Sequence, residues 1–149
     1  PGEERLKTPL TAGEPTEVEM AYESFTPGQK VLIEGMGDWV ELALVHWHVQ
    51  QSDPTAPLSA IQRNTLALIR SLTDDGLFEL GSYPPSATGF VRASDTEGAL
   101  SQIADAYVNH FADGQWERKW LLNITPKGEQ MAQPFMETYR REWDAQSGE

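Results

Sequence analysis

Three histidines are the residues of this chain that could hold a metal ion or move a proton near neutral pH. His46 and His48 lie two residues apart, and His110 is far from both along the chain. Metal-binding helices place their ligands three or four residues apart, whereas a spacing of two turns the side chains about 200° from each other. We therefore expect His46 and His48 to be helix histidines near the edge of the core, and we expect no metal site.

Other patterns that support catalysis are missing from the sequence. There is no cysteine and no G-x-S-x-G motif, so the usual activated nucleophiles are not present. The stretch "EGMGDW" lacks the third glycine of a dinucleotide-binding loop. Asp74 and Asp75 precede Gly76, where aspartate is ordinary turn chemistry. The sequence predicts that the chain is not an enzyme and binds no cofactor.

The charge balance is the strongest global feature of the chain. Its 149 residues include 23 acidic and 11 basic side chains, which gives a net charge of −12. A phosphate backbone is bound by Lys and Arg, so this balance disfavours nucleic acid and favours a basic protein partner. No apolar run approaches the roughly 20 residues of a membrane span. The absence of cysteine permits a reducing interior, and we expect a cytoplasmic protein with no membrane contact.

The elements that would position any site follow from capping signals and apolar spacing. Residues 1–19 are predicted to be a flexible or foreign N-terminal tail, followed by a single domain over residues 20–149. Alternation in "TEVEMAYES" indicates either a short edge strand or a tail that orders on contact. A first helix begins at Thr26-Pro27, and a second begins at Asp38, with Glu41 completing a capping box, and runs to about Gln51.

The second half of the chain predicts alternating helices and strands. Ser59 and Gln62 form a capping box for a long helix that ends before Gly76, and a strand follows over "LFELGSY". A short strand is expected at "TGFVRAS", then a helix over 96–112 capped by Ser94 and Glu97. A strand over 119–124 leads into a last helix, which Pro134 should kink. Phe135, Tyr139 and Trp143 should share one face of it.

Two phrases of this pattern carry a family resemblance. Leu72, Gly76 and Leu77 stand where MarR-like winged helix-turn-helix proteins end the recognition helix and start the wing. The second phrase, which closes the wing in that family, is matched by Ile124, Thr125, Lys127 and Gly128. Roughly residues 38–133 are similar to this family. The resemblance implies an α+β, mainly helical fold: a winged-helix-like core with a helix inserted between the two wing strands. The strand after Gly76 should then pair antiparallel with residues 119–124.

The resemblance also implies a transcriptional regulator that binds DNA, which is the alternative function. The residues placed to read DNA would be Gln62, Arg63, Arg70 and Arg92. The wing differs from the family because residues 82–119 contain more acidic than basic side chains. Fold resemblance alone therefore does not carry the function across.

The favoured hypothesis is a non-catalytic, acidic protein-interaction module with a basic protein partner. Immunity proteins and antitoxins neutralise basic effectors by the same charge logic. Aromatic residues anchor such interfaces, although most of the five tryptophans are expected in the core. Trp39 and Trp47, eight residues apart, should lie on one side of a helix. The predicted partner face consists of Asp113, Trp116, Glu117, Tyr139 and Trp143.

Overall fold

The computed structural model describes residues 21–147, which divide into two compact units. The larger unit is Thr26–Gln133, and the described parts of the smaller unit are residues 21–25 and 134–147. The predicted tail over 1–19 lies outside the described residues, as does most of the alternating stretch. The last part of the alternating stretch, Tyr22–Ser24, is a 3-10 helix and not a strand.

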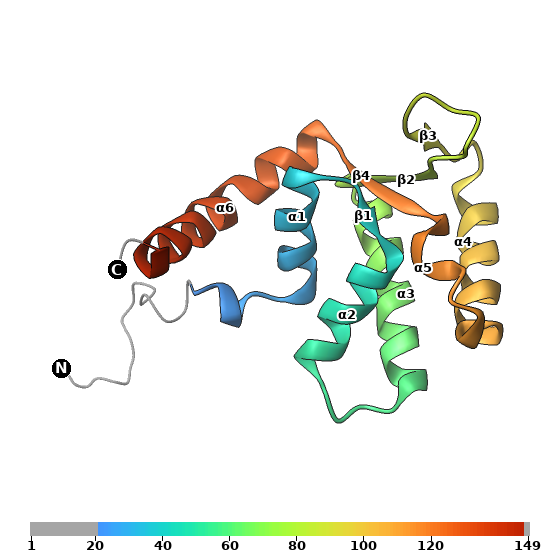
Figure 1. The fold of residues 1–149 in the computed structure, drawn as a ribbon, viewed down its shortest axis with the longest axis horizontal. Helices are drawn as coiled ribbons and strands as arrows, with labels where there is room; N and C mark the ends of the chain where they lie inside the picture. Colours follow the sequence, from blue (N-terminus) through green and yellow to red (C-terminus); the bar gives the residue numbers. More distant parts are fainter. Residues whose placement is uncertain (1–20, 148–149) are drawn as a thin grey trace. The chain divides into compact units, whose positions relative to one another are not determined.

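The larger unit is mainly helical with one small sheet, as expected for an α+β fold (Figure 1). Its elements in order are α1 (Pro27–Gly37), β1 (Val40–Glu41), α2 (Leu42–Ser52), α3 (Leu58–Asp74), β2 (Phe78–Ser82), β3 (Val91–Arg92), α4 (Thr96–Ala104), α5 (Trp116–Lys119), β4 (Leu121–Ile124) and the first residues of α6 (Pro126–Ser147). A π-helix, Asp105–Asn109, and a 3-10 helix, Phe111–Asp113, lie between α4 and α5. No helix in residues 21–147 is both long and apolar enough to cross a membrane.

The sheet joins strands that are far apart in the sequence. Its order is β1-β4-β2-β3, and every pair is antiparallel. Leu80 of β2 lies opposite Leu122 of β4, and both side chains are buried. The predicted antiparallel pairing of the strand after Gly76 with residues 119–124 is confirmed. The predicted helix between these two strands is also present as α4.

Three helices cover the sheet and form the core. Helix α1 packs against β4, α3 packs against β2, and α2 and α3 lie side by side (Figure 1). Val31, Ile69 and Leu122 are completely buried where these elements meet. The α1 cap is as predicted: the Thr26 hydroxyl accepts the Gln29 N–H, and the Gln29 side chain accepts the Thr26 N–H.

The predicted start of the second helix at Asp38 is wrong. Asp38 ends α1, and its Oδ1 accepts the N–H of Trp39 at 2.7 Å instead of capping a new helix. Val40 and Glu41 are extended and pair with Leu122 and Leu121 of β4, so α2 begins only at Leu42. Backbone N–H and C=O groups of Val40 and Glu41 form hydrogen bonds with a strand about eighty residues away. They therefore do not need a helix cap as a local partner.

Two other predicted caps are also wrong. Helix α3 starts at Leu58 without a side-chain cap, and Gln62 donates instead to the Tyr107 carbonyl at 2.9 Å. Helix α4 is capped by Asp95, whose Oδ1 accepts the Gly98 N–H, and not by Ser94. The long helix predicted over 96–112 changes at residue 105 into the π-helix that contains Tyr107.

The smaller unit is held together by aromatic pairs. Tyr22 lies 5.2 Å from Tyr139 and Phe25 lies 5.2 Å from Phe135, measured between ring centroids. The Tyr22 N–H also donates to Glu142 Oε2 at 2.9 Å. Two of the three residues predicted to share a face of the last helix therefore pack in this unit, whereas Trp143 is 60% exposed.

Candidate protein-interaction groove

An open groove of about 410 Å³ lies where α1 ends, β1 runs and α2 begins. Its lining residues are Glu34, Asp38, Trp39, Glu41, Ala43, Leu44 and Trp47. Three of the seven carry carboxylates and two carry indole rings. We call these seven residues the acidic groove.

The local fold brings these side chains together. Glu34 lies in the last turn of α1, and Asp38 is the extended residue that follows the helix. Leu44 and Trp47 are three residues apart on α2 and therefore share one face. The extended residues of β1 between the helices place Trp39 and Glu41 at the same groove. The prediction that Trp39 and Trp47 lie on one side of a single helix is wrong, because Trp39 precedes β1, but both line this groove.

Hydrogen bonds hold two of the groove carboxylates in place. Glu34 Oε2 lies 3.0 Å from Nε2 of His48, whose side chain is buried beneath it. Asp38 is fixed by the Trp39 N–H. Glu41 lies 3.9 Å from the exposed Arg118, and an ion pair of that kind contributes little to stability. The carboxylates of Glu34 and Asp38 are thus ordered before any ligand arrives.

An exposed indole ring and a nearby carboxylate both attract a cation. Trp47 is 50% exposed, and Trp39, which lines the same groove, is partly exposed. A cation over an exposed indole face gains about 0.5–1 kcal/mol, and a nearby carboxylate adds Coulomb attraction. The groove can therefore bind a cationic side chain and pack its alkyl stem.

A second side of α2, about 100° around the helix from Trp47, carries an aromatic cluster. His46 faces Tyr107, Phe111 and Trp116, and its ring centroid lies 5.5–5.6 Å from each of theirs. Phe111 and Trp116 stack at 5.1 Å. We call these four residues the closed cluster.

Burial sets the protonation of the closed cluster. It raises the pKa of the Tyr107 phenol to about 12. Burial also lowers the pKa of His46, and the carboxylate of Glu117 partly opposes this. The Tyr107 hydroxyl and His46 Nδ1 share a hydrogen bond of 2.5 Å, in which the donor depends on the His46 tautomer. Tyr107 is 1% exposed and belongs to the core, whereas His46 is half-buried at its edge.

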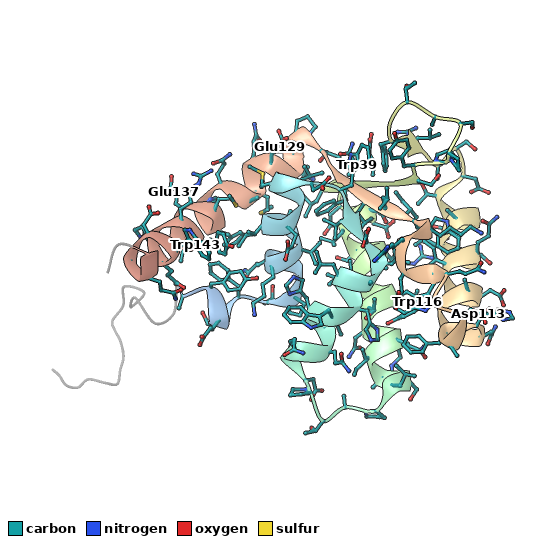
Figure 2. The ribbon with its side chains drawn as sticks, viewed as in Figure 1. Trp39, Asp113, Trp116, Glu129, Glu137 and Trp143 are labelled. Carbon is teal, nitrogen blue, oxygen red and sulfur yellow. The ribbon has the colours of Figure 1, made fainter. Side chains whose placement is uncertain are left out.

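The central tryptophan of the predicted partner face, Trp116, is buried. Trp116 is only 3% exposed, and its indole N–H donates to the Phe111 carbonyl at 2.9 Å, so its assignment as an exposed contact is wrong (Figure 2). Asp113 and Glu117 are exposed beside it. Tyr139 and Trp143 belong to the smaller unit.

The residues proposed to read DNA do not form a free basic surface. Gln62 is 6% exposed and committed to the Tyr107 carbonyl, so its assignment as a base reader is wrong. Both terminal nitrogens of Arg70 bind the Glu97 carboxylate, at 2.8 and 3.0 Å. Arg92 lies 3.8 Å from Glu79. Of the four, Arg63 alone is both exposed and without an ion pair to another described residue.

The three histidines make different contacts. His48 supports Glu34, His46 joins the closed cluster, and His110 is exposed near Asp105 and Asp113. Within residues 21–147 no group of three or more histidines and carboxylates is arranged to hold a metal ion.

Sequence reasoning did not find the acidic groove as a site. The available signals were the spacing of Glu34 and Asp38 and the two tryptophans at 39 and 47, but β1 was not predicted between them.

Comparison with known proteins adds no relative: no protein-family model, no curated protein sequence and no solved structure matches this chain.

Proposed function

We propose that this chain is a non-catalytic, acidic protein-interaction module that binds a basic protein partner. The observation that carries the proposal is the acidic groove, which combines three carboxylates with two partly exposed tryptophans. Tryptophan is enriched among the residues that dominate binding energy at protein interfaces. The net charge of −12 adds long-range attraction for a basic partner and speeds its association.

The proposal is tested by selecting ligands for the intact chain from a displayed library of random peptides. Enriched peptides should be rich in Arg and Lys, and their association rate should fall as salt is added, because screening weakens the steering field. Enrichment of neutral or acidic peptides, or of none above background, would overturn the proposal.

The variants Trp47→Ala and Trp143→Ala locate the binding surface. Both residues are exposed tryptophans, but Trp47 lines the acidic groove and Trp143 lies in the smaller unit. Loss of the selected peptides with Trp47→Ala but not with Trp143→Ala supports the groove. The opposite pattern contradicts it.

A second candidate, a DNA-binding regulator, is favoured by one observation. The order α1-β1-α2-α3-β2-β4, with β4 between β1 and β2, is consistent with a MarR-like winged-helix core. In such a core α3 would be the recognition helix and the segment holding α4 would be an insertion in the wing. We rank this candidate second because Gln62 is buried and Arg70 and Arg92 face carboxylates.

Binding to generic duplex DNA separates the two candidates. Counterion release by one or two free arginines is small, so we expect no complex at micromolar protein concentration near physiological salt. Fluorescence anisotropy of a labelled duplex provides the measurement. Micromolar or tighter affinity with a salt slope of several charges would reverse the ranking.

A further inference from the structure

The acidic groove continues into an apolar surface on the strand pair β2–β3. Trp39 lies 5.4 Å from Tyr83 and 6.0 Å from Phe90, measured between ring centroids. Tyr83 is 51% exposed and Phe90 is half-buried. We call Tyr83 and Phe90 the aromatic shelf. Because Trp39 belongs to the groove and touches the shelf, the two form one continuous surface.

A glycine fixes the shelf against the sheet. A Cβ atom on Gly81 would lie 2.6 Å from Phe90 and 2.1 Å from the Val91 carbonyl oxygen. Only glycine permits this approach, so the ring of Phe90 rests directly on β2. The Phe90 ring is thereby held beside Trp39, and less freedom is lost when a ligand covers it.

The two halves of this surface differ in charge. The groove carries Glu34, Asp38 and Glu41, whereas Tyr83 and Phe90 bear no charge. A ligand that covers both halves must offer a cation at one end and apolar side chains at the other. A second copy of this chain would bring a net charge of −12 against an acidic surface, and nucleic acid would bring phosphates.

We propose that this surface binds an extended peptide segment of the partner, with an arginine in the acidic groove and adjacent apolar residues on the aromatic shelf. This inference rests on the proposed function and names the part of the basic partner that is recognised. Arginine fits better than lysine because its planar guanidinium stacks on an indole face and meets a carboxylate through two parallel hydrogen bonds. Ala43 and Leu44 would contact its alkyl stem.

Four short peptides test the inference on the full chain. They are the acetylated amides Arg-Arg-Leu-Leu, Lys-Lys-Leu-Leu, citrulline-citrulline-Leu-Leu and Arg-Arg-Ser-Ser. Binding is followed through the NMR signals of the five tryptophan indole N–H groups. We expect Arg-Arg-Leu-Leu to bind tightest, to shift the Trp39 and Trp47 signals, and to leave the buried Trp116 signal in place.

The other peptides separate charge, shape and the apolar contact. The citrulline peptide keeps the shape of arginine without its charge and should bind at least about tenfold more weakly. The lysine and Arg-Arg-Ser-Ser peptides should each bind at least about threefold more weakly than Arg-Arg-Leu-Leu.

Matched variants locate the contacts. Asp38→Asn and Asp74→Asn remove the same charge, but Asp38 lines the groove and Asp74 is at the end of α3. Asp38→Asn should weaken Arg-Arg-Leu-Leu more than Asp74→Asn does. Tyr83→Ser should reduce the affinity for Arg-Arg-Leu-Leu to that for Arg-Arg-Ser-Ser, and should leave the latter unchanged.

The outcomes distinguish this inference from the proposed function. If the lysine peptide binds as tightly as the arginine peptide, or if the serine and leucine peptides bind alike, the inference is overturned while the proposed function stands. The same holds if basic peptides bind without shifting Trp39 or Trp47. If no basic peptide binds at all and the library selection yields none, both fail.

Discussion

Two sides of helix α2 carry aromatic side chains that differ in burial. On one side His46 lies within the closed cluster of Tyr107, Phe111 and Trp116. On the other side Trp47 stays half exposed over the acidic groove. Two neighbouring residues of one helix thus face the largely buried aromatic cluster and an open surface.

The difference lies in what the rest of the chain brings to each side. The π-helix and α5 bring aromatic rings to the His46 side, and the Trp116 N–H finds the Phe111 carbonyl there. On the Trp47 side, the end of α1 and the segment of β1 bring carboxylates to the groove. An aromatic residue is therefore a core residue or an interface residue according to its neighbours and not its type.

The largest expected effect comes from emptying the closed cluster. Trp116→Ala removes a side chain that is 3% exposed and leaves a cavity, so the free energy of unfolding should fall by about 3–5 kcal/mol. Urea denaturation followed by circular dichroism measures this. A loss below about 1 kcal/mol would show that the cluster does not hold the fold, and the contrast with the groove would fail.

A smaller loss is expected where α3 meets the π-helix. Gln62→Leu removes the N–H donor of the Tyr107 carbonyl in a buried site, which should cost about 1–3 kcal/mol of unfolding free energy. The neighbouring exposed Arg63→Ala is the matched control and should change stability by less than about 0.5 kcal/mol. Equal effects of the two variants would mean that this hydrogen bond does not stabilise the cluster.

The closed cluster should also make stability depend on pH. Burial lowers the pKa of His46 below 6.5, so between the lowered value and 6.5 the unfolded chain binds more protons than the folded chain. The contribution of neutral His46 to the free energy of unfolding is therefore complete above pH 6.5. This contribution is lost as the pH falls through the lowered pKa of His46. His46→Gln should flatten the fall in melting temperature between about pH 7.5 and pH 5.

The exposed and non-titrating Gln51 of α2 supplies the control for this pH measurement, as the variant Gln51→Ala. It should leave the pH dependence of the melting temperature like that of the parent chain. If His46→Gln also leaves that dependence unchanged, burial of His46 in the cluster does not govern its protonation.

The smallest effect on stability is expected at the groove. Trp47→Ala removes a half-exposed ring, so the free energy of unfolding should change by about 0.5 kcal/mol or less while peptide binding is lost. The same denaturation measurement compares it directly with Trp116→Ala. A destabilisation as large as that of Trp116→Ala would assign Trp47 to the core and remove the distinction between the two sides.

Local signals in the sequence were sufficient for several elements. The Thr26-Pro27 start of α1, the long α3 before Gly76 and the junction of β4 with α6 at Thr125-Pro126 are as predicted. Each depends on residues within about four positions of one another, because caps, turns and helix periodicity are local chemistry. The α+β class and the antiparallel pairing of β2 with β4 were also predicted.

Errors occurred where a distant segment replaced a local partner. Asp38 did not cap a helix because Val40 and Glu41 pair with β4, and Gln62 did not cap α3 because its amide reaches Tyr107. The partner face centred on Trp116 failed for the same reason, because α2 and the π-helix enclose that ring.

By itself the sequence determined the acidic charge, the absence of cysteine, the Thr26 cap of α1 and the strands on either side of α4, since these depend on composition and on nearby residues. Only the tertiary structure decided that Trp47 stays exposed beside Glu34, Asp38 and Glu41 while Trp116 is buried. Side chains become buried through contacts between segments far apart in the chain, and no local spacing specifies those contacts.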